Sequence, residues 1–230
     1  SVQLTVFAAA SLTETLNEIA EQYKTVAPNV ELVFNFDSSG TLKTQIEEGA
    51  DCDLFLSAAQ KQMNALQDED LINTNTRIDL LENKVVLAVP EGNPADIQSF
   101  EDIGTDQCKR IALGNEDVPV GSYSVEILTN LGILDELESG NKITYGSNVK
   151  EVTTQISEGS VDAGVVYCTD AFSAGLKVVD EATKEMCGQV IYPAAVLKTA
   201  PNAEAAKEFL AYLQTDRAAT VFESVGFTAL

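Results

Sequence analysis

Two segments that lie 110 residues apart share most of their sequence, and this repeat constrains the fold more than any other feature. Thr44–Gly49 reads TQIEEG and residues 154–159 read TQISEG, which match at five of six positions. After a few further residues, each segment leads into an apolar strand-like run, Leu54–Leu56 in one case and Val165–Tyr167 in the other. A chance match is the alternative for so short a stretch. A true repeat predicts two lobes of similar design.

Strand-like and helix-like patterns alternate along the chain, which predicts an α/β fold with mainly parallel sheets flanked by helices. Ser11 and Glu14 fit a capping box at the start of the first helix, and later helices are expected after the turn at 37–41, from about Ser122 and from Val149. Pro193 favours an edge or a bend for the last strand. The expected strands are 3–9, 30–36, 53–57, 84–90, 110–113, 143–145, 163–167 and 189–197.

Two apolar strands, near 84–90 and 190–197, are not followed directly by a helix, and we expect them to connect the lobes. Lobe one would then hold residues 1–82 and 193–230, and lobe two would hold residues 83–192. Such a two-segment hinge suits closure around a ligand in the cleft between the lobes. We therefore expect a clamp.

Charge and composition exclude several classes of protein. The chain has 14 basic and 36 acidic residues, a net charge of −22, which disfavours nucleic acid as a partner. It has no histidine, so a Ser-His-Asp triad and a histidine-bearing zinc site are impossible. No spacing of lysines or carboxylates singles out a catalytic group. An anion could still bind if its donors were neutral hydrogen-bond groups.

The four cysteines, Cys52, Cys108, Cys168 and Cys187, do not form a metal-binding pattern. We expect Cys168 and Cys187 to form a disulfide in an oxidising compartment, and free thiols are the alternative. No apolar run approaches the length of a membrane span, roughly 18–20 residues. The strand-like run close to Ser1 suggests a mature exported form or a cytoplasmic protein.

Small hydroxyl or amide residues stand where strands pass into helices. Free N–H groups and the helix dipole at such points attract anions, although plain helix capping is the alternative at each of them. Tyr167 ends a strand-like run, so it is either a half-buried aromatic or a hydroxyl directed at a ligand. The junctions are Ser11, residues 38–41, residues 120–122 and residues 147–149.

Several motifs taken together resemble the periplasmic molybdate-binding proteins of ABC importers, over residues 2–228. This resemblance implies a type II periplasmic-binding-protein fold, two-lobed, whose ligand is molybdate or tungstate. The motifs are VFAAASL at 6–12, SSGTL at 38–42, DLFLSA at 53–58, VPVG at 118–121, GVVY at 164–167 and GF at 226–227.

The same resemblance implies the ligand donors. Ser11 and Ser39 would donate through hydroxyl and backbone N–H, Val120 and Val149 through backbone N–H, and Tyr167 through its phenol. This chain departs from the family pattern at Gly40, where a third serine is common, and at Cys168 and Val120, where smaller residues are common. The departure at Val120 matters little, because only its backbone would be used.

The expected function is high-affinity capture of molybdate or tungstate and its delivery to an ABC permease, by an extracytoplasmic monomer that is periplasmic or lipid-anchored. No catalytic residue, cofactor or metal-cation site is expected. The alternatives are a binding protein for sulfate or phosphate, a regulatory sensor domain, and an enzyme on the same fold. The sensor would need a DNA-binding segment and the enzyme an acid–base constellation, and the sequence shows neither.

Overall fold

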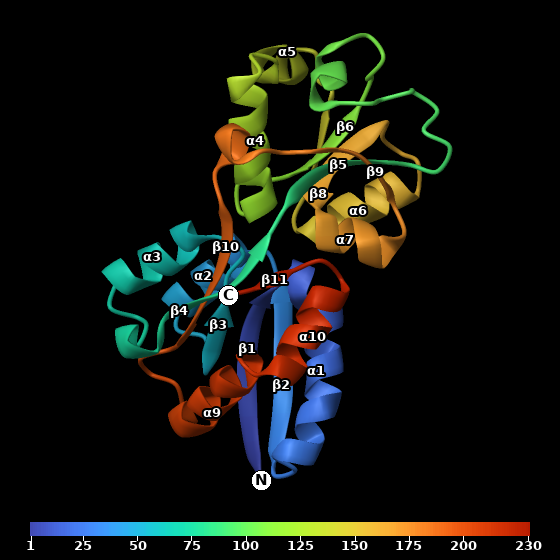
Figure 1. The fold of residues 1–230 in the computed structure, drawn as a ribbon. Helices are drawn as coiled ribbons and strands as arrows, with labels where there is room; N and C mark the ends of the chain where they lie inside the picture. Colours follow the sequence, from blue (N-terminus) through green and yellow to red (C-terminus); the bar gives the residue numbers. More distant parts are fainter. The chain divides into compact units, whose positions relative to one another are not determined.

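The computed structural model describes residues 1–230 and divides into two units. The terminal unit is Ser1–Glu82 together with Ile191–Leu230, and the central unit is Asn83–Val190. The chain therefore leaves the terminal unit once and returns to it once, through the strands β4 and β10 (Figure 1).

The terminal unit is built from these elements: β1 Val2–Ala9, the 3-10 helix η1 Ala10–Leu12, α1 Thr13–Val26, β2 Val30–Asp37, α2 Ser39–Glu47, β3 Leu54–Leu56, α3 Gln60–Asp68, η2 Thr74–Thr76, β4 Ile78–Asn83, β10 Val190–Val196, α9 Ala203–Leu213, α10 Asp216–Ser224 and β11 Thr228–Ala229. Its six strands form one sheet in the order β11-β4-β10-β3-β1-β2. Strands β2 and β3 both pair with β1 in parallel, whereas β10 runs antiparallel to β3.

The central unit is built from these elements: β5 Val85–Val89, η3 Phe100–Gly104, β6 Ile111–Gly114, α4 Pro119–Asn130, α5 Leu134–Ser139, β7 Ile143–Gly146, α6 Val149–Ser157, β8 Ala163–Tyr167, α7 Cys168–Ala174, β9 Lys177–Glu181 and α8 Lys184–Cys187. Its five strands have the order β7-β6-β8-β5-β9. Strands β7 and β8 pair with β6 in parallel, and β5 is antiparallel to both β8 and β9.

The predicted α/β class is confirmed, and each sheet is mixed. The parallel strands are the ones joined by helices, as parallel pairing requires. Helices α4 and α6 pack against β6 and β8, and α1 packs against β2 and α10. Buried apolar residues fill both units, for example Phe7 and Phe55 in the terminal unit and Leu87 and Val165 in the central unit.

The expectation that Pro193 lies at an edge or a bend is wrong, because β10 lies between β3 and β4. Ala194 pairs with Leu56, which places Pro193 opposite Ser57, one residue beyond the end of β3. The Ser57 N–H donates to the Pro193 carbonyl at 3.0 Å. Proline lacks an N–H, but here β3 has already ended, so the ladder within β3 loses no bond.

The repeat found in the sequence is also a repeat of structure. In α2 and α6 alike, the glycine after the helix has a positive φ, +94° at Gly49 and +73° at Gly159. The following N–H groups close the helix end in the same way, Ala50 on the Gln45 carbonyl at 3.0 Å and Ser160 on the Gln155 carbonyl at 3.2 Å. Glycine adopts this backbone conformation without strain, which explains why it recurs at both helix ends.

The predicted disulfide between Cys168 and Cys187 is wrong, since all four cysteines are free thiols. The two side chains have different surroundings. Cys168 Sγ donates to Asn83 Oδ1 at 3.3 Å, whereas Cys187 Sγ contacts the Gly188 carbonyl at 3.7 Å.

None of the helices combines the length and the apolar character needed to cross a membrane.

Candidate functional site

Ser39 is the first residue of α2, and its neighbour Ser38 caps that helix. The Ser38 Oγ accepts a hydrogen bond from the Thr41 N–H at 3.1 Å, which leaves the side chain of Ser39 unused by the cap. The Ser39 Oγ instead accepts from the Ala58 N–H at 2.9 Å. Because this bond occupies an acceptor position, the hydroxyl hydrogen of Ser39 is still available for a ligand. The Ser39 N–H is in the first turn, where no helical carbonyl accepts it.

Ser11 is not the N-cap of α1, so the predicted capping box with Glu14 is wrong. Helix α1 begins at Thr13, and its N-cap residue, Leu12, makes no side-chain cap. Ser11 lies inside η1, a single turn that directly follows β1. Its Oγ lies 2.7 Å from the hydroxyl oxygen of Tyr192, and both side chains are buried. The extra turn takes Ser11 off the helix start and places its hydroxyl against the sheet.

Val120 is the second residue of α4, which begins at Pro119, three residues earlier than the sequence predicts. Its N–H therefore belongs to the first turn and has no carbonyl partner within the helix. Proline suits this start because its missing N–H would be unused there. A Cβ on Gly121 would lie only 2.4 Å from the Gly114 carbonyl oxygen, so glycine is needed for α4 to begin this close to the end of β6.

Val149 is the first residue of α6 and is buried at 3% exposure. Asn148 caps the helix, its Oδ1 accepting from the Glu151 N–H at 3.0 Å. The side chain of Val149 packs in the interior, so only its backbone N–H can act as a donor. This position confirms the local arrangement expected from the sequence, a capping residue followed by an unpaired N–H.

Tyr167 ends β8 and directly precedes α7, and it is 1% exposed, so the expectation of a half-buried side chain is wrong. Its N–H donates to Asp170 Oδ2 at 3.3 Å, and this bond ties the end of β8 to the first turn of α7. Tyr167 stands 110 residues after Ser57, the residue that follows β3 in the terminal unit. A buried tyrosine fixed in this way is a preorganised donor.

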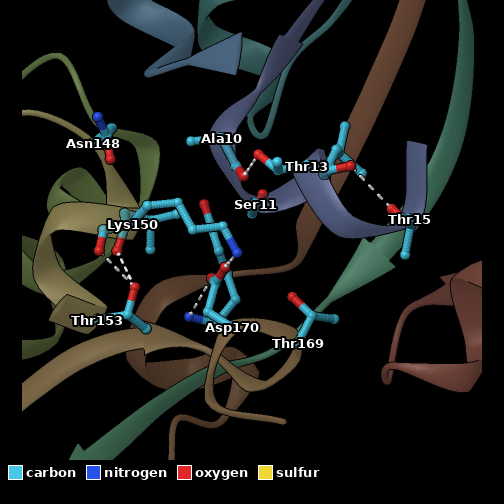
Figure 2. Close-up of polar contacts among 12 residues, drawn as sticks. Ala10, Ser11, Thr13, Thr15, Asn148, Lys150, Thr153, Thr169 and Asp170 are labelled. Atoms are coloured by element: carbon cyan, nitrogen blue, oxygen red, sulfur yellow. Dashed lines mark hydrogen bonds and ion pairs between the residues drawn. The ribbon is translucent and has the colours of Figure 1, made fainter. Parts of the chain in front are cut away.

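A buried ion pair lies beside these donors in the central unit. Lys150 Nζ is 3.2 Å from Asp170 Oδ1, and the Asp170 side chain is fully buried whereas that of Lys150 is 29% exposed (Figure 2). Lys150 directly follows Val149 in α6. Because the carboxylate of Asp170 offsets the charge of Lys150, the pair adds no net charge next to Val149.

Each unit gathers its predicted donors at one edge of its sheet. In the terminal unit, Ser11 follows β1 and Ser39 follows β2, and these strands are parallel neighbours. In the central unit, Val120 follows β6, Val149 follows β7 and Tyr167 ends β8, and these three strands are again parallel neighbours. Ligands of open α/β sheets bind at such carboxyl ends. Within its own unit, each set of predicted donors therefore occupies the same edge.

A groove beside α1 and β2 in the terminal unit contains none of the predicted donors. It has a volume of about 850 Å³, and Glu18, Glu21 and Glu31 line it together with Lys24 and Phe34. Three carboxylates against one lysine give this groove the wrong sign for an anion. The donor sets at the sheet edges are thus the better candidate site.

Sequence reasoning did not find the groups that hold the donors in place. Tyr192 is 181 residues from Ser11, and Ala58 is 19 residues from Ser39, so no local pattern connects either pair. Asp170 was anticipated only as a helix cap, without its ion pair to Lys150. The one sequence signal is indirect, because Ser57 and Ala58 follow β3 as Tyr167 and Cys168 follow β8, at the same spacing as the repeat.

Two α/β units with neutral donors at the carboxyl ends of parallel strands define a solute-binding protein. The family model for bacterial extracellular solute-binding proteins matches residues 4–228. The chain therefore belongs to this family.

Relatives and solved structures agree with this assignment. The molybdate-binding protein ModA of Haemophilus influenzae is 36% identical, over 100% of this chain and 91% of the relative. ModA of Escherichia coli is 38% identical, over 98% and 89%. Among solved structures, the periplasmic molybdate-binding protein of Azotobacter vinelandii superposes with a TM-score of 0.88 at 23% identity, over 98% of each chain, which shows the shared fold.

Proposed function

We propose that this chain binds molybdate or tungstate outside the cytoplasmic membrane and delivers it to the permease of an ABC importer. One observation carries the proposal. Ser39 and Val149 each stand at the first position of a helix whose cap is provided by the residue before, so both units offer an unused N–H beside the end of a parallel strand. Relatives that are 36% and 38% identical are named molybdate-binding proteins.

In this proposal, donors from both units hold one tetrahedral oxyanion. Ser11 and Ser39 donate from the terminal unit, and Val120, Val149 and Tyr167 donate from the central unit. All five groups are neutral, so binding depends on directed hydrogen bonds and helix dipoles rather than on a counter-charge. The pairing of Lys150 with Asp170 supports this, because the lysine nearest these donors already has a buried partner.

A site made only of donors favours a fully deprotonated oxyanion. Hydrogenphosphate carries a proton that needs an acceptor, and none of the five proposed groups is suited to accept it. Sulfate lacks that proton but is smaller than molybdate, so donor spacing would select against it. Molybdate and tungstate are nearly equal in size, and we expect both to bind.

The proposed role involves no catalysis and no cofactor, and its partners are the oxyanion and the permease, not nucleic acid. We propose a monomer, periplasmic or anchored to the cell surface by lipid. The chain has no histidine, and none of the proposed donors is a general acid or base at neutral pH.

Calorimetric titration of the protein with molybdate, tungstate, sulfate and phosphate tests the proposal. The expected result is one ion per chain for molybdate and tungstate, with sulfate at least tenfold weaker and phosphate undetectable. Tighter binding of sulfate or phosphate would instead identify a different member of the oxyanion-binding class. Absence of binding by all four ions would refute the function.

A further inference from the structure

Ser11 and Tyr192 form a buried hydroxyl pair, although 181 residues separate them in the sequence. The two oxygens lie 2.7 Å apart, with Ser11 4% and Tyr192 1% exposed. Tyr192 lies in β10, and it is the second residue after the chain re-enters the terminal unit at Ile191. A contact of this length is a good hydroxyl–hydroxyl hydrogen bond.

The direction of this bond decides what Ser11 can offer a ligand. A hydroxyl has one hydrogen to donate and two lone pairs that accept. If Ser11 donated to Tyr192, it would have no hydrogen left for an anion. If Tyr192 donates to Ser11, the hydrogen of Ser11 is free, and the bond that it receives strengthens its own donation through polarisation.

The second proposed serine shows the same arrangement. Ser39 Oγ accepts from the buried Ala58 N–H at 2.9 Å. That N–H can only donate, so the direction is certain there. Both serines of the terminal unit thus have a buried donor group from another strand or loop next to the hydroxyl oxygen.

The ring of Tyr192 is held firmly by its neighbours. It packs edge-on against Phe227 with centroids 5.3 Å apart and an interplanar angle of 80°. Phe227 in turn packs against Phe222 at 5.9 Å. Strand β10 itself lies between β3 and β4. The hydroxyl of Tyr192 therefore has little freedom to leave Ser11.

We propose that Tyr192 is a positioning residue for the oxyanion: its hydroxyl donates to Ser11 Oγ and so directs the hydrogen of Ser11 to the ligand. This inference rests on the proposed function, since it needs Ser11 to be a ligand donor. It adds a residue outside the donor set, on the strand that brings the chain back into the terminal unit, to the determinants of affinity.

A double-mutant cycle with molybdate tests the inference. Tyr192→Phe keeps the ring and removes only the hydroxyl, and we expect it to weaken molybdate binding about threefold to tenfold. In a Ser11→Ala background, the same change should have no further effect, because the group that Tyr192 orients is gone. Additive losses, or parent-like affinity of Tyr192→Phe, would overturn the inference.

Tyr212→Phe is the matched control. Tyr212 is another buried tyrosine of the terminal unit, and its hydroxyl donates to Gln22 Oε1 at 3.1 Å. Urea denaturation should show a lower midpoint for both tyrosine variants, whereas only Tyr192→Phe should change affinity. A midpoint shift without an affinity change in Tyr192→Phe would mean a purely structural role and would overturn the inference.

Failure of the proposed function would look different. In that case the parent protein itself binds neither molybdate nor tungstate. If the parent binds and Ser11→Ala binds equally well, the function stands but Ser11 is not a donor, and the role of Tyr192 is refuted with it.

Discussion

Ser39 and Val149 are structural equivalents, 110 residues apart, each the first residue of a nine-residue helix. The residue before each one caps the helix, Ser38 through Oγ at 3.1 Å and Asn148 through Oδ1 at 3.0 Å. Because the cap is made by the preceding side chain, the N–H of Ser39 and of Val149 can serve a ligand. Capping and ligand binding are thus divided between adjacent residues.

This division predicts opposite effects for adjacent substitutions. Ser38→Ala removes a cap and should lower the free energy of unfolding by about 0.5–2 kcal/mol, with little change in molybdate affinity. Ser39→Ala removes a hydroxyl donor to a charged ligand and should weaken binding roughly tenfold to a hundredfold. Chemical denaturation and calorimetry on both variants check this. Equal affinity losses at the two positions would contradict the division.

Tyr167→Phe should weaken molybdate binding roughly tenfold to a hundredfold, because a hydrogen bond to a charged group is worth about 1.5–3 kcal/mol. The ring remains and continues to fill the core at the end of β8, so the unfolding free energy of the ligand-free protein should change by about 1 kcal/mol or less. Titration and urea denaturation measure the two effects. A purely structural tyrosine would show the reverse pattern, a loss of stability at unchanged affinity.

Molybdate affinity should be nearly constant between pH 6 and 8. The chain has no histidine, and serine, tyrosine and backbone donors do not titrate in that range. Calorimetry at several pH values, at constant ionic strength, checks this expectation. A tenfold change in affinity would show that an ionisable group, such as one of the Lys150–Asp170 pair, contacts the ion.

Stability should fall at alkaline pH through Cys52. Burial raises the pKa of the Cys52 thiol from its ordinary value of 9.0 to about 12. Between these values the unfolded chain loses the proton while the folded chain keeps it, so the free energy of unfolding decreases as pH rises above about 9. Urea denaturation at pH 8 and pH 10.5 should show a smaller decrease for Cys52→Ala than for the parent. An identical decrease would exclude Cys52 as the cause.

Local sequence patterns were sufficient where neighbouring residues determine structure. The cap at Asn148, the strand ending at Tyr167 and the start of β2 at Val30 follow from nearby residues and agree with the structure. The capping box at Ser11 failed because the chain first makes a 3-10 turn. The start of α4 was predicted too late, because Pro119 and Gly121 indicated a loop, whereas proline also suits a first helical turn.

Tertiary partners were beyond the reach of those patterns. Pro193 indicated an edge strand, yet β10 is internal because β3 ends before the proline is reached. The partners of Ser11 and Ser39, Tyr192 and Ala58, come from other strands and loops. The positions of the donors were predicted, but the groups that orient them were not, since orientation depends on packing between distant segments.

The central claim is that one oxyanion is held by neutral donors of both units, and a crystal structure of the molybdate complex tests it most directly. Anomalous scattering from molybdenum locates the ion without ambiguity. The account predicts a single peak with molybdate oxygens within hydrogen-bond distance of the backbone nitrogens of Ser39 and Val149 and of the Tyr167 hydroxyl. A peak surrounded by lysine or arginine side chains, or at the groove beside α1 and β2, would contradict it.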